Sequence, residues 1–251
     1  MRLAVVMPVF NEEATLAEAV ARLDAVPAPA TTGGSQPLER RLILVDDGST
    51  DDTPRIVRLL GERPDVLTVI HKRNMGKGAA LRSGFAAALA DGADVVLVHD
   101  ADLEYDPADH AALLRPILDG RADAVIGTRF QGQAHRVLYY WHSVANRVIT
   151  TLSNMLTNLN LSDIECCFKA FRREALERIR IEENRFGVEP ELVAKLARLR
   201  LQHEDREGET RPARIYEVPV SYAGRTYAEG KKITWRDGVA AVWCILKYGL
   251  N

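Results

Sequence analysis

Three acidic residues lie within five positions near the middle of the chain, at Asp100, Asp102 and Glu104. Carboxylates this close repel one another, and a hard divalent cation with oxygen ligands relieves that repulsion. They follow residues 95–98, four Val and Leu residues typical of a strand buried on both faces of a parallel sheet. Open α/β sheets bind ligands at the carboxyl ends of their strands, so the sequence predicts a metal site here. The alternative, that an acid simply begins the next helix, suits Asp106 better, because it precedes a proline.

Polar residues also follow the first and second predicted strands. They are Pro8, Asn11 and Glu12 after the first strand, and the run Asp46-Asp47-Gly48-Ser49-Thr50-Asp51 after the second. Because the carboxyl ends of parallel strands share one edge of a sheet, these side chains should converge with the acids of the central strand. For the second run a local alternative stays open, in which Asp46 braces the turn.

A glycine-rich block, Asn74-Met75-Gly76-Lys77-Gly78, precedes a predicted helix. It is not a dinucleotide-binding fingerprint, because Leu81 stands where the third glycine belongs, and it lacks the Ser or Thr of a P-loop. Its glycines permit close backbone approach at a helix start. Lys77 either meets a phosphate or is solvated, and the sequence does not choose between the two.

The elements that position these residues follow from hydrophobic periodicity. Predicted strands span residues 3–9, 42–45, 66–70, 95–98, 124–127 and 215–220, and predicted helices span 11–25, 50–60, 77–89, 109–118, 188–199 and 235–248. Residues 137–159 form a long amphipathic stretch, and residues 202–212 are charged and predict a solvated loop. Alternating strands and helices in the first half indicate right-handed βαβ units and a mostly parallel sheet.

Composition narrows the functional classes. The chain has 251 residues, is 47% hydrophobic and carries a formal net charge of −2, which argues against a nucleic-acid-binding protein. No apolar run is long enough for a signal peptide or a membrane span. The three cysteines include the adjacent Cys166 and Cys167, which disfavours a disulfide between them and favours reduced thiols in the cytoplasm.

In order along the chain, these blocks resemble the inverting glycosyltransferases of family 2, in particular the dolichyl-phosphate mannose synthase and polyprenyl-phosphate glycosyltransferase branch. The resemblance covers nearly the whole chain. It implies the α/β GT-A fold, a mostly parallel sheet flanked by helices. Residues 1–130 would then form the nucleotide-sugar-binding half, and residues 131–251 the acceptor-side half of the same catalytic domain.

The resemblance also implies roles for single residues. The nucleotide sugar, a GDP- or UDP-hexose, would contact Pro8, Asn11, Glu12, Asp47, Asn74, Lys77, Asp100, Ala101 and Asp102. Asp100, Asp102 and Glu104 match the family's D-x-D motif, which holds Mg²⁺ or Mn²⁺ on the donor diphosphate. Relatives often carry Gln where Glu104 stands.

On the acceptor side, Gly127-Thr128-Arg129 matches the family's G-S-R block, and residues 221–232 resemble a mobile R-x-x-G-x-K loop. The phosphate- and acceptor-binding residues implied are Arg129, His142, Asn146, Arg225, Lys231 and Lys232. A structural salt bridge is the alternative for Arg129, and a solvated loop is the alternative for the lysines. Arg136 or Arg147 would compensate where His142 and Asn146 depart from related synthases.

A phosphate acceptor is ionised near neutral pH and can attack without a base, whereas a hydroxyl needs one. The sequence therefore predicts transfer of a mannose- or glucose-type hexose to polyprenyl phosphate, with Asp102 and Arg129 as catalytic residues and Asp163 and Glu165 as reserve bases. Two alternatives stay open: transfer to a soluble or glycan hydroxyl, and a nucleotide-sugar-binding protein without catalysis. Residues 137–159 and 235–248 either contact the inner membrane surface or form core or dimer contacts.

Overall fold

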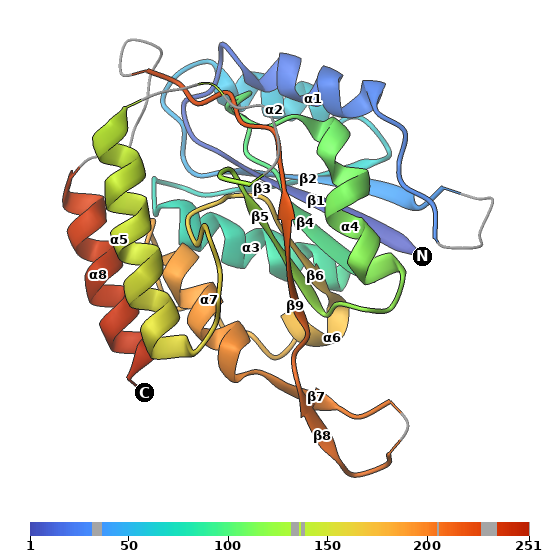
Figure 1. Cartoon of the computed structure of the whole chain (residues 1–251). Coiled ribbons are helices and arrows are strands. Elements are labelled where there is room, and N and C mark those ends of the chain that lie inside the picture. Colours follow the sequence, from blue (N-terminus) through green and yellow to red (C-terminus); the bar gives the residue numbers. More distant parts are fainter. Residues whose placement is uncertain (32–36, 132–135, 137–138, 205, 227–234, 251) are drawn as a thin grey trace.

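The computed structural model describes residues 1–31, 37–131, 136, 139–204, 206–226 and 235–250, which build a seven-stranded sheet with helices on both faces (Figure 1). The strands of this sheet are β1 (Arg2–Val9), β2 (Glu39–Asp46), β3 (Val66–Ile70), β4 (Val95–Val98), β5 (Ala124–Thr128), β6 (Lys169–Arg172) and β9 (Ile215–Pro219). The helices are α1 (Leu16–Ala25), α2 (Thr53–Leu60), α3 (Lys77–Ala90), α4 (His110–Leu118), α5 (Tyr140–Thr157), α6 (Arg173–Leu176), α7 (Val188–Arg198) and α8 (Trp235–Gly249), with a 3₁₀ turn at Pro107–Asp109.

The sheet is mostly parallel, as predicted, and its strand order is β3-β2-β1-β4-β6-β5-β9. Neighbours β1 and β2, β2 and β3, β1 and β4, and β5 and β9 run parallel. Only β6 is antiparallel to its neighbours within this sheet, and it lies between β4 and β5. The second half of the chain thus supplies a strand to the middle of the sheet, next to the strand that carries the acids.

Alternating side chains of β1 show how the two layers form. Leu3, Val5 and Met7 pack into the core that α1 and α4 cover, whereas Ala4 and Val6 pack against α3 and α7. This is the period-2 geometry of a strand with a helix layer on each face. All four residues of β4 are at most 1% exposed, which confirms the prediction of a strand buried on both faces.

One predicted segment is wrong. Residues 202–212 do not form a simple solvated loop, because β7 (Arg200–Gln202) and β8 (Thr210–Pro212) pair as an antiparallel hairpin that projects from the sheet (Figure 1). Its charge is partly neutralised within the fold: Arg211 Nη2 donates to Asp123 Oδ1 at 2.9 Å and lies 2.6 Å from Glu204 Oε1. The sequence did not predict this pairing, because both short strands carry a charged side chain, as a solvated loop would.

Helix α1 begins later than predicted, at Leu16 rather than at residue 11. Asn11 has a φ of +51°, in the left-handed region, so the helix cannot extend back through it. The Glu12 carbonyl accepts from the N–H groups of Thr15 and Leu16, which forms a turn before the helix. Residues 11–15 therefore form a loop at the carboxyl end of β1.

Helices α5 and α8 pack side by side at one end of the molecule (Figure 1). Trp141, Val148 and Met155 recur every seven residues on α5 and are exposed, and Val239 and Trp243 are exposed on α8. Each helix thus carries an outward apolar stripe that the described chain leaves uncovered. Over the described residues, no helix is both long enough and apolar enough to cross a bilayer.

Candidate active site

A cavity of about 850 Å³ opens at the carboxyl ends of β1, β2 and β4 and is closed on the other side by α5, α7 and α8. It brings together most of the residues that the sequence singled out. Those that line it are Pro8, Glu12, Asp47, Asn74, Lys77, Asp100, Ala101, Asp102, Glu104, Arg129, His142, Asn146, Glu165 and Arg225. Lys231 and Lys232 lie outside the described residues.

Asp47 binds the backbone of the glycine-rich block. Its Oδ2 accepts from Gly76 N–H at 2.6 Å and from Asn74 Nδ2 at 3.0 Å, and its Oδ1 accepts from Met75 N–H at 3.0 Å. His71 Nδ1 lies 2.6 Å from the same Oδ1. Asp47 therefore holds the turn at residues 74–76 against the cavity wall, and its contact with a nucleotide stays a prediction.

Asn11 is not among the residues that line the cavity, and its contact with a nucleotide sugar stays a prediction. Its Oδ1 accepts from Thr50 N–H at 2.8 Å, and its own N–H donates to Ser49 Oγ at 3.0 Å. Because an Asn side chain tolerates positive φ and bonds local backbone, it joins the loops after β1 and β2. Asn11 thus positions the neighbouring Glu12, which does line the cavity.

Asp100 and Asp102 each face a cation from another element. Lys77 Nζ donates to Asp100 Oδ2 at 2.9 Å, and Arg225 Nη2 lies 3.3 Å from Asp102 Oδ2. Burial raises the pKa of Asp102 to about 7, with further contributions from the charges of Asp100 and Glu104. Burial also opposes ionisation of Asp100, but Lys77 holds its pKa below the ordinary value.

Lys77 is buried between two acids, so the alternative of a solvated lysine is wrong. Its Nζ lies 2.9 Å from Asp100 and 3.2 Å from Glu189 Oε1, and 2.9 Å from Cys167 Sγ. Burial opposes its charge, but Asp100, Cys167 and Glu189 raise its pKa well above the usual value. Lys77 therefore stays protonated inside the cavity wall.

Glu104 is engaged by the loop that follows β9. Tyr222 Oη donates to its Oε2 at 3.0 Å, and Arg225 N–H donates to its Oε1 at 2.7 Å. Arg225 also reaches Glu12 Oε2 at 3.4 Å. Both carboxylate oxygens of Glu104 thus anchor residues 222–225 over the acids, 118 to 121 positions away along the chain.

The carboxylates that line the cavity fit a divalent cation only in part. Asp100 Oδ1 is buried and has no hydrogen-bond partner among the described residues, and Asp102 is crowded by like charge, so a cation would satisfy both. Across the described parts of the chain, however, no three His, Cys, Asp or Glu side chains are arranged as a metal-binding group. Asp100 and Asp102 alone fit a cation that takes its remaining oxygen ligands from a bound substrate.

Arg129 forms a bidentate pair with Asp163. Its Nε donates to Asp163 Oδ2 at 2.7 Å and its Nη2 to Oδ1 at 2.8 Å, and its N–H also donates to Oδ2 at 3.1 Å. The structure thus contains the structural salt bridge that was the alternative for Arg129. Burial opposes ionisation of Asp163, but Arg129 keeps its pKa below the ordinary value. Asp163 does not line the cavity and its lowered pKa makes it a weak base, so its reserve role stays a prediction.

Glu165 differs from Asp163 both in its position relative to the cavity and in the direction of its pKa shift. It lines the cavity, and burial together with the charge of Glu189 raises its pKa to about 7. Its Oε1 is buried without a hydrogen-bond partner among the described residues. A carboxylate in this state can accept a proton or a hydrogen bond near neutral pH.

Sequence reasoning missed the place of Glu189. This side chain is 3% exposed, lines the cavity and pairs with Lys77 and Lys169. Tyr222 was likewise not singled out. The signal for Glu189 was the acidic start of α7 after an aromatic residue, which does not by itself distinguish a buried carboxylate from an exposed one.

The glycines of the block at residues 74–78 approach protein backbone rather than open space. A Cβ on Gly78 would lie 2.2 Å from the Glu183 carbonyl oxygen, and one on Gly76, whose φ is +99°, would lie 2.4 Å from the Asn184 carbonyl oxygen. The segment before α7 thus packs directly on the start of α3. The glycines set the position of Lys77 beside Glu189.

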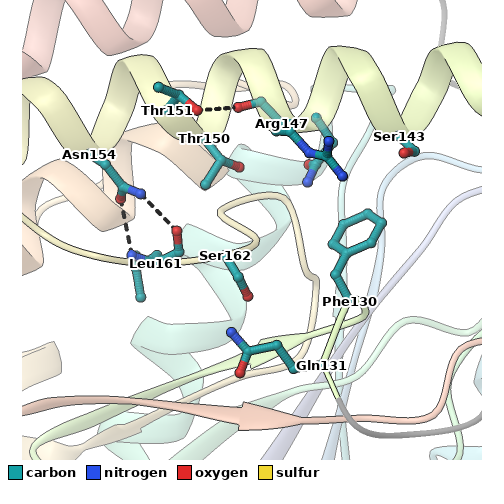
Figure 2. Close-up of a pocket in the computed structure, with 10 residues that line it drawn as sticks. Phe130, Gln131, Ser143, Arg147, Thr150, Thr151, Asn154, Leu161 and Ser162 are labelled. Carbon is teal, nitrogen blue, oxygen red and sulfur yellow. Dashed lines mark hydrogen bonds between the residues drawn. The ribbon is translucent and has the colours of Figure 1, made fainter.

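A second cavity of about 360 Å³ lies along α5 and shares Asn146 with the first. Figure 2 shows Ser143, Arg147 and Thr150 on the helix across from Phe130. Asn154 exchanges two hydrogen bonds with the Leu161 backbone at the far end of this cavity (Figure 2). Arg147, named as a substitute phosphate contact, lies here. Arg136, the other substitute, donates to the Gly224 carbonyl at 3.3 Å.

Residues 4–180 match the family described as Glycosyl transferase family 2. Similar curated proteins include the undecaprenyl-phosphate 4-deoxy-4-formamido-L-arabinose transferases of Klebsiella pneumoniae subsp. pneumoniae, 28% identical over 92% of this chain and 62% of the relative, and of Serratia proteamaculans, 30% identical over 82% and 61%. The chain thus spans about three fifths of the length of these relatives.

Solved structures show the same fold. Glucosyl-3-phosphoglycerate synthase from Mycobacterium tuberculosis in complex with UDP superposes with a TM-score of 0.69 at 21% identity, covering 99% of this chain and 80% of the other. The complex of that enzyme with Mn²⁺, UDP and glucosyl-3-phosphoglycerate gives a TM-score of 0.67 at 23% identity, over 98% and 79%. At this identity the likeness establishes the GT-A architecture alone.

Proposed function

This chain belongs to glycosyl transferase family 2, and on that premise we propose that it transfers a sugar from a nucleotide sugar to polyprenyl phosphate, with inversion at the anomeric carbon. The observation that carries the proposal is the convergence, in one cavity, of Asp100 and Asp102 with Lys77, Arg129 and Arg225. Acids that hold a cation and basic groups that face phosphates are what a reaction between two anionic substrates requires.

The donor side is assigned to residues 1–130. Glu12, Asp47 and Asn74 form the nucleotide wall, and Asp100 and Asp102 would hold Mg²⁺ or Mn²⁺. Bound there, the cation would neutralise the leaving diphosphate. The relatives solved with Mn²⁺ and UDP support this arrangement, and they favour UDP over GDP as the first nucleotide to test.

The acceptor side is assigned to residues 131–251 together with Arg129. His142 and Asn146 of α5 line the cavity, and Asn146 accepts from Arg129 Nη2 at 3.5 Å. The ionised oxygen of a phosphate monoester attacks without a general base, so the Arg129–Asp163 pair serves to hold positive charge in place. The names of the undecaprenyl-phosphate relatives support this acceptor class.

A lipid acceptor also requires contact with a membrane surface. The helices that line the acceptor side, α5 and α8, carry the exposed apolar side chains of Trp141, Met155 and Trp243. Aromatic residues of this kind favour the boundary between headgroups and acyl chains. We therefore assign a peripheral position on the membrane, with these two helices against the lipid.

The experiment that tests the proposal measures nucleotide release from UDP- and GDP-sugars with Mg²⁺ or Mn²⁺, each with and without a short polyprenyl phosphate. We expect release that needs both metal and lipid phosphate. Asp102→Asn should lower the rate by at least about 100-fold, because one charged ligand of the cation is lost. Metal-dependent release that is indifferent to the lipid would contradict the acceptor assignment.

Glu165 supports one second candidate function, transfer to a hydroxyl acceptor with Glu165 as general base. Its pKa of about 7 means that the ionised form increases as pH rises through 7. If it is the base, kcat with a hydroxyl acceptor rises over pH 6–8, and Glu165→Gln removes that rise. A flat profile in the unmodified protein excludes this role.

A further inference from the structure

Two carboxylates that line the cavity each have an oxygen without a hydrogen-bond partner among the described residues. Glu165 Oε1 and Glu189 Oε1 are buried, and neither accepts a hydrogen bond from the residues that the structure describes. Both side chains line the same cavity. Buried carboxylate oxygens are normally hydrogen-bonded, so such a pair points to donors that a ligand supplies.

The charges around this pair are only partly balanced. Glu189 Oε2 pairs with Lys169 Nζ, and its Oε1 lies 3.2 Å from Lys77 Nζ without the alignment of a hydrogen bond. Lys169 also donates to the carbonyls of Ile164 and Cys166, and Arg129 is taken up by Asp163. No cation in the described part of the chain forms a salt bridge with Glu165.

This surplus of negative charge restricts what can bind there. A phosphate would meet two carboxylates and be repelled, and no three acidic or imidazole groups among the described residues form a metal-binding group. Hydroxyl groups fit, because each donates one hydrogen bond to a carboxylate oxygen without bringing negative charge. The sugar carries most of the hydroxyl groups of a nucleotide-sugar donor.

We propose that Glu165 and Glu189 form the subsite that recognises the sugar of the donor, by accepting hydrogen bonds from its hydroxyl groups. The inference rests on the proposed use of a nucleotide sugar, but not on the identity of the acceptor. Ion pairs with Lys77 and Lys169 fix the position of Glu189. The pair then acts as a specificity determinant, because a sugar lacking the matching hydroxyl leaves a buried carboxylate oxygen without a hydrogen bond.

The test compares the affinity of a sugar nucleotide with that of the bare nucleotide, by calorimetry with Mn²⁺ and no acceptor. The pairs are UDP-glucose with UDP and GDP-mannose with GDP. In the unmodified protein the sugar nucleotide of the accepted pair should bind more tightly. Glu165→Gln and Glu189→Gln should each reduce this ratio by about tenfold, the size of one lost charged hydrogen bond, and leave the affinity for the bare nucleotide within about twofold.

Glu174→Gln is the matched control, since Glu174 is exposed, pairs with Arg172 and lies outside the cavity. Because Glu189→Gln also removes a partner of Lys169, a melting curve is measured for each variant. If Glu189→Gln does not fold, the conclusion depends on Glu165→Gln alone. An equal loss of affinity for UDP and UDP-glucose in Glu165→Gln would overturn the inference, as would a sugar nucleotide that binds no more tightly than its nucleotide in the unmodified protein.

The outcome separates this inference from the proposed function and from the role of a base. If the sugar-dependent affinity depends on Glu165 while no transfer to polyprenyl phosphate occurs, the acceptor proposal fails and the subsite stands. If Glu165→Gln lowers only kcat and its pH dependence, and the affinity ratio is unchanged, Glu165 is a base and the subsite assignment is wrong.

Discussion

The adjacent carboxylates Asp46 and Asp47 both bind backbone N–H groups, but at different distances along the chain. Asp46 Oδ1 accepts from Ser49 N–H at 2.9 Å and braces its own turn. Asp47 instead holds the turn that precedes α3, 28 to 29 residues away. These hydrogen bonds matter because Asp47 is only 3% exposed. Without its carboxylate, the backbone N–H groups that it binds would be left unpaired.

Replacing Asp47 should therefore loosen the nucleotide wall. Asp47→Ala removes the acceptor for Met75 and Gly76, so we expect at least about tenfold weaker nucleotide binding, from the loss of one or more charged hydrogen bonds. Amide exchange at these two positions should also become faster. Calorimetry and hydrogen exchange measure the two effects.

The exposed Asp52, which pairs with Arg55 on the surface, supplies the control. Asp52→Ala should leave both measurements unchanged, because exposed ion pairs contribute little. Unchanged exchange protection at Met75 and Gly76 in Asp47→Ala would show that the turn does not depend on this carboxylate.

At the scale of elements, Asp123 ties the β7–β8 hairpin to the main sheet. It lies just before β5 and accepts from Arg211 Nη2 at 2.9 Å and from the Arg214 N–H at 2.7 Å. Burial opposes its ionisation, but these hydrogen bonds lower its pKa from 3.8 to about 2. The hairpin, absent from the sequence-based prediction, is thus held by a carboxylate about 90 residues earlier.

This contact predicts a pH-dependent effect on stability. Because the pKa of Asp123 is lower in the folded state, its stabilisation is complete above about pH 4 and is lost as pH falls towards 2. Asp123→Asn should lower the free energy of unfolding by about 2 kcal/mol at pH 7, the size of a lost hydrogen bond to a charged group, and the difference should shrink below pH 4.

Denaturant unfolding at several pH values measures this difference. Glu209→Gln, in the same hairpin, is the control, since its pair with Arg206 is exposed and should contribute little. A difference between Asp123→Asn and the unmodified protein that persists unchanged at pH 2.5 would contradict the assignment.

At the scale of the whole molecule, the two helix layers differ in what they leave exposed. The layer of α1, α2 and α4 covers one face of the sheet, while α5 and α8 close the cavity and carry Trp141 at 75% and Trp243 at 66% exposure. The proposed acceptor side and the apolar stripes thus belong to the same two helices. This placement suits a substrate whose phosphate enters the cavity while its hydrocarbon chain stays in lipid.

Removing both indoles should weaken membrane association. The double variant Trp141→Ser/Trp243→Ser should bind vesicles of phosphatidylethanolamine and phosphatidylglycerol at least about tenfold less, because burying a large apolar side chain contributes roughly 1.5–3 kcal/mol. Vesicle sedimentation measures binding. Leu59→Ser, an exposed position on α2, is the control. Equal sedimentation of the double variant and the unmodified protein would contradict the membrane orientation.

The sequence by itself determined the alternation of strands and helices in the first half of the chain, the burial of β4 and the edge of the sheet at which the polar residues gather. These follow from local periodicity and from the rule that parallel strands present their carboxyl ends together. Even the strand bounds at 66–70 and 95–98 agree with the structure. The sequence did not predict β6 or the β7–β8 hairpin. The family resemblance added the GT-A fold, which the comparisons bear out.

Only the tertiary structure decided which side chains face each other. Arg129 meets Asp163 across 34 residues and Arg225 meets Glu104 across 121, while Glu189 meets Lys77 from the opposite half of the chain. It also bonds Asn11 to Thr50 and leaves Glu165 Oε1 without a hydrogen-bond partner among the described residues. Partners this far apart are set by how helices pack on the sheet, and that packing depends on the whole core rather than on any local pattern.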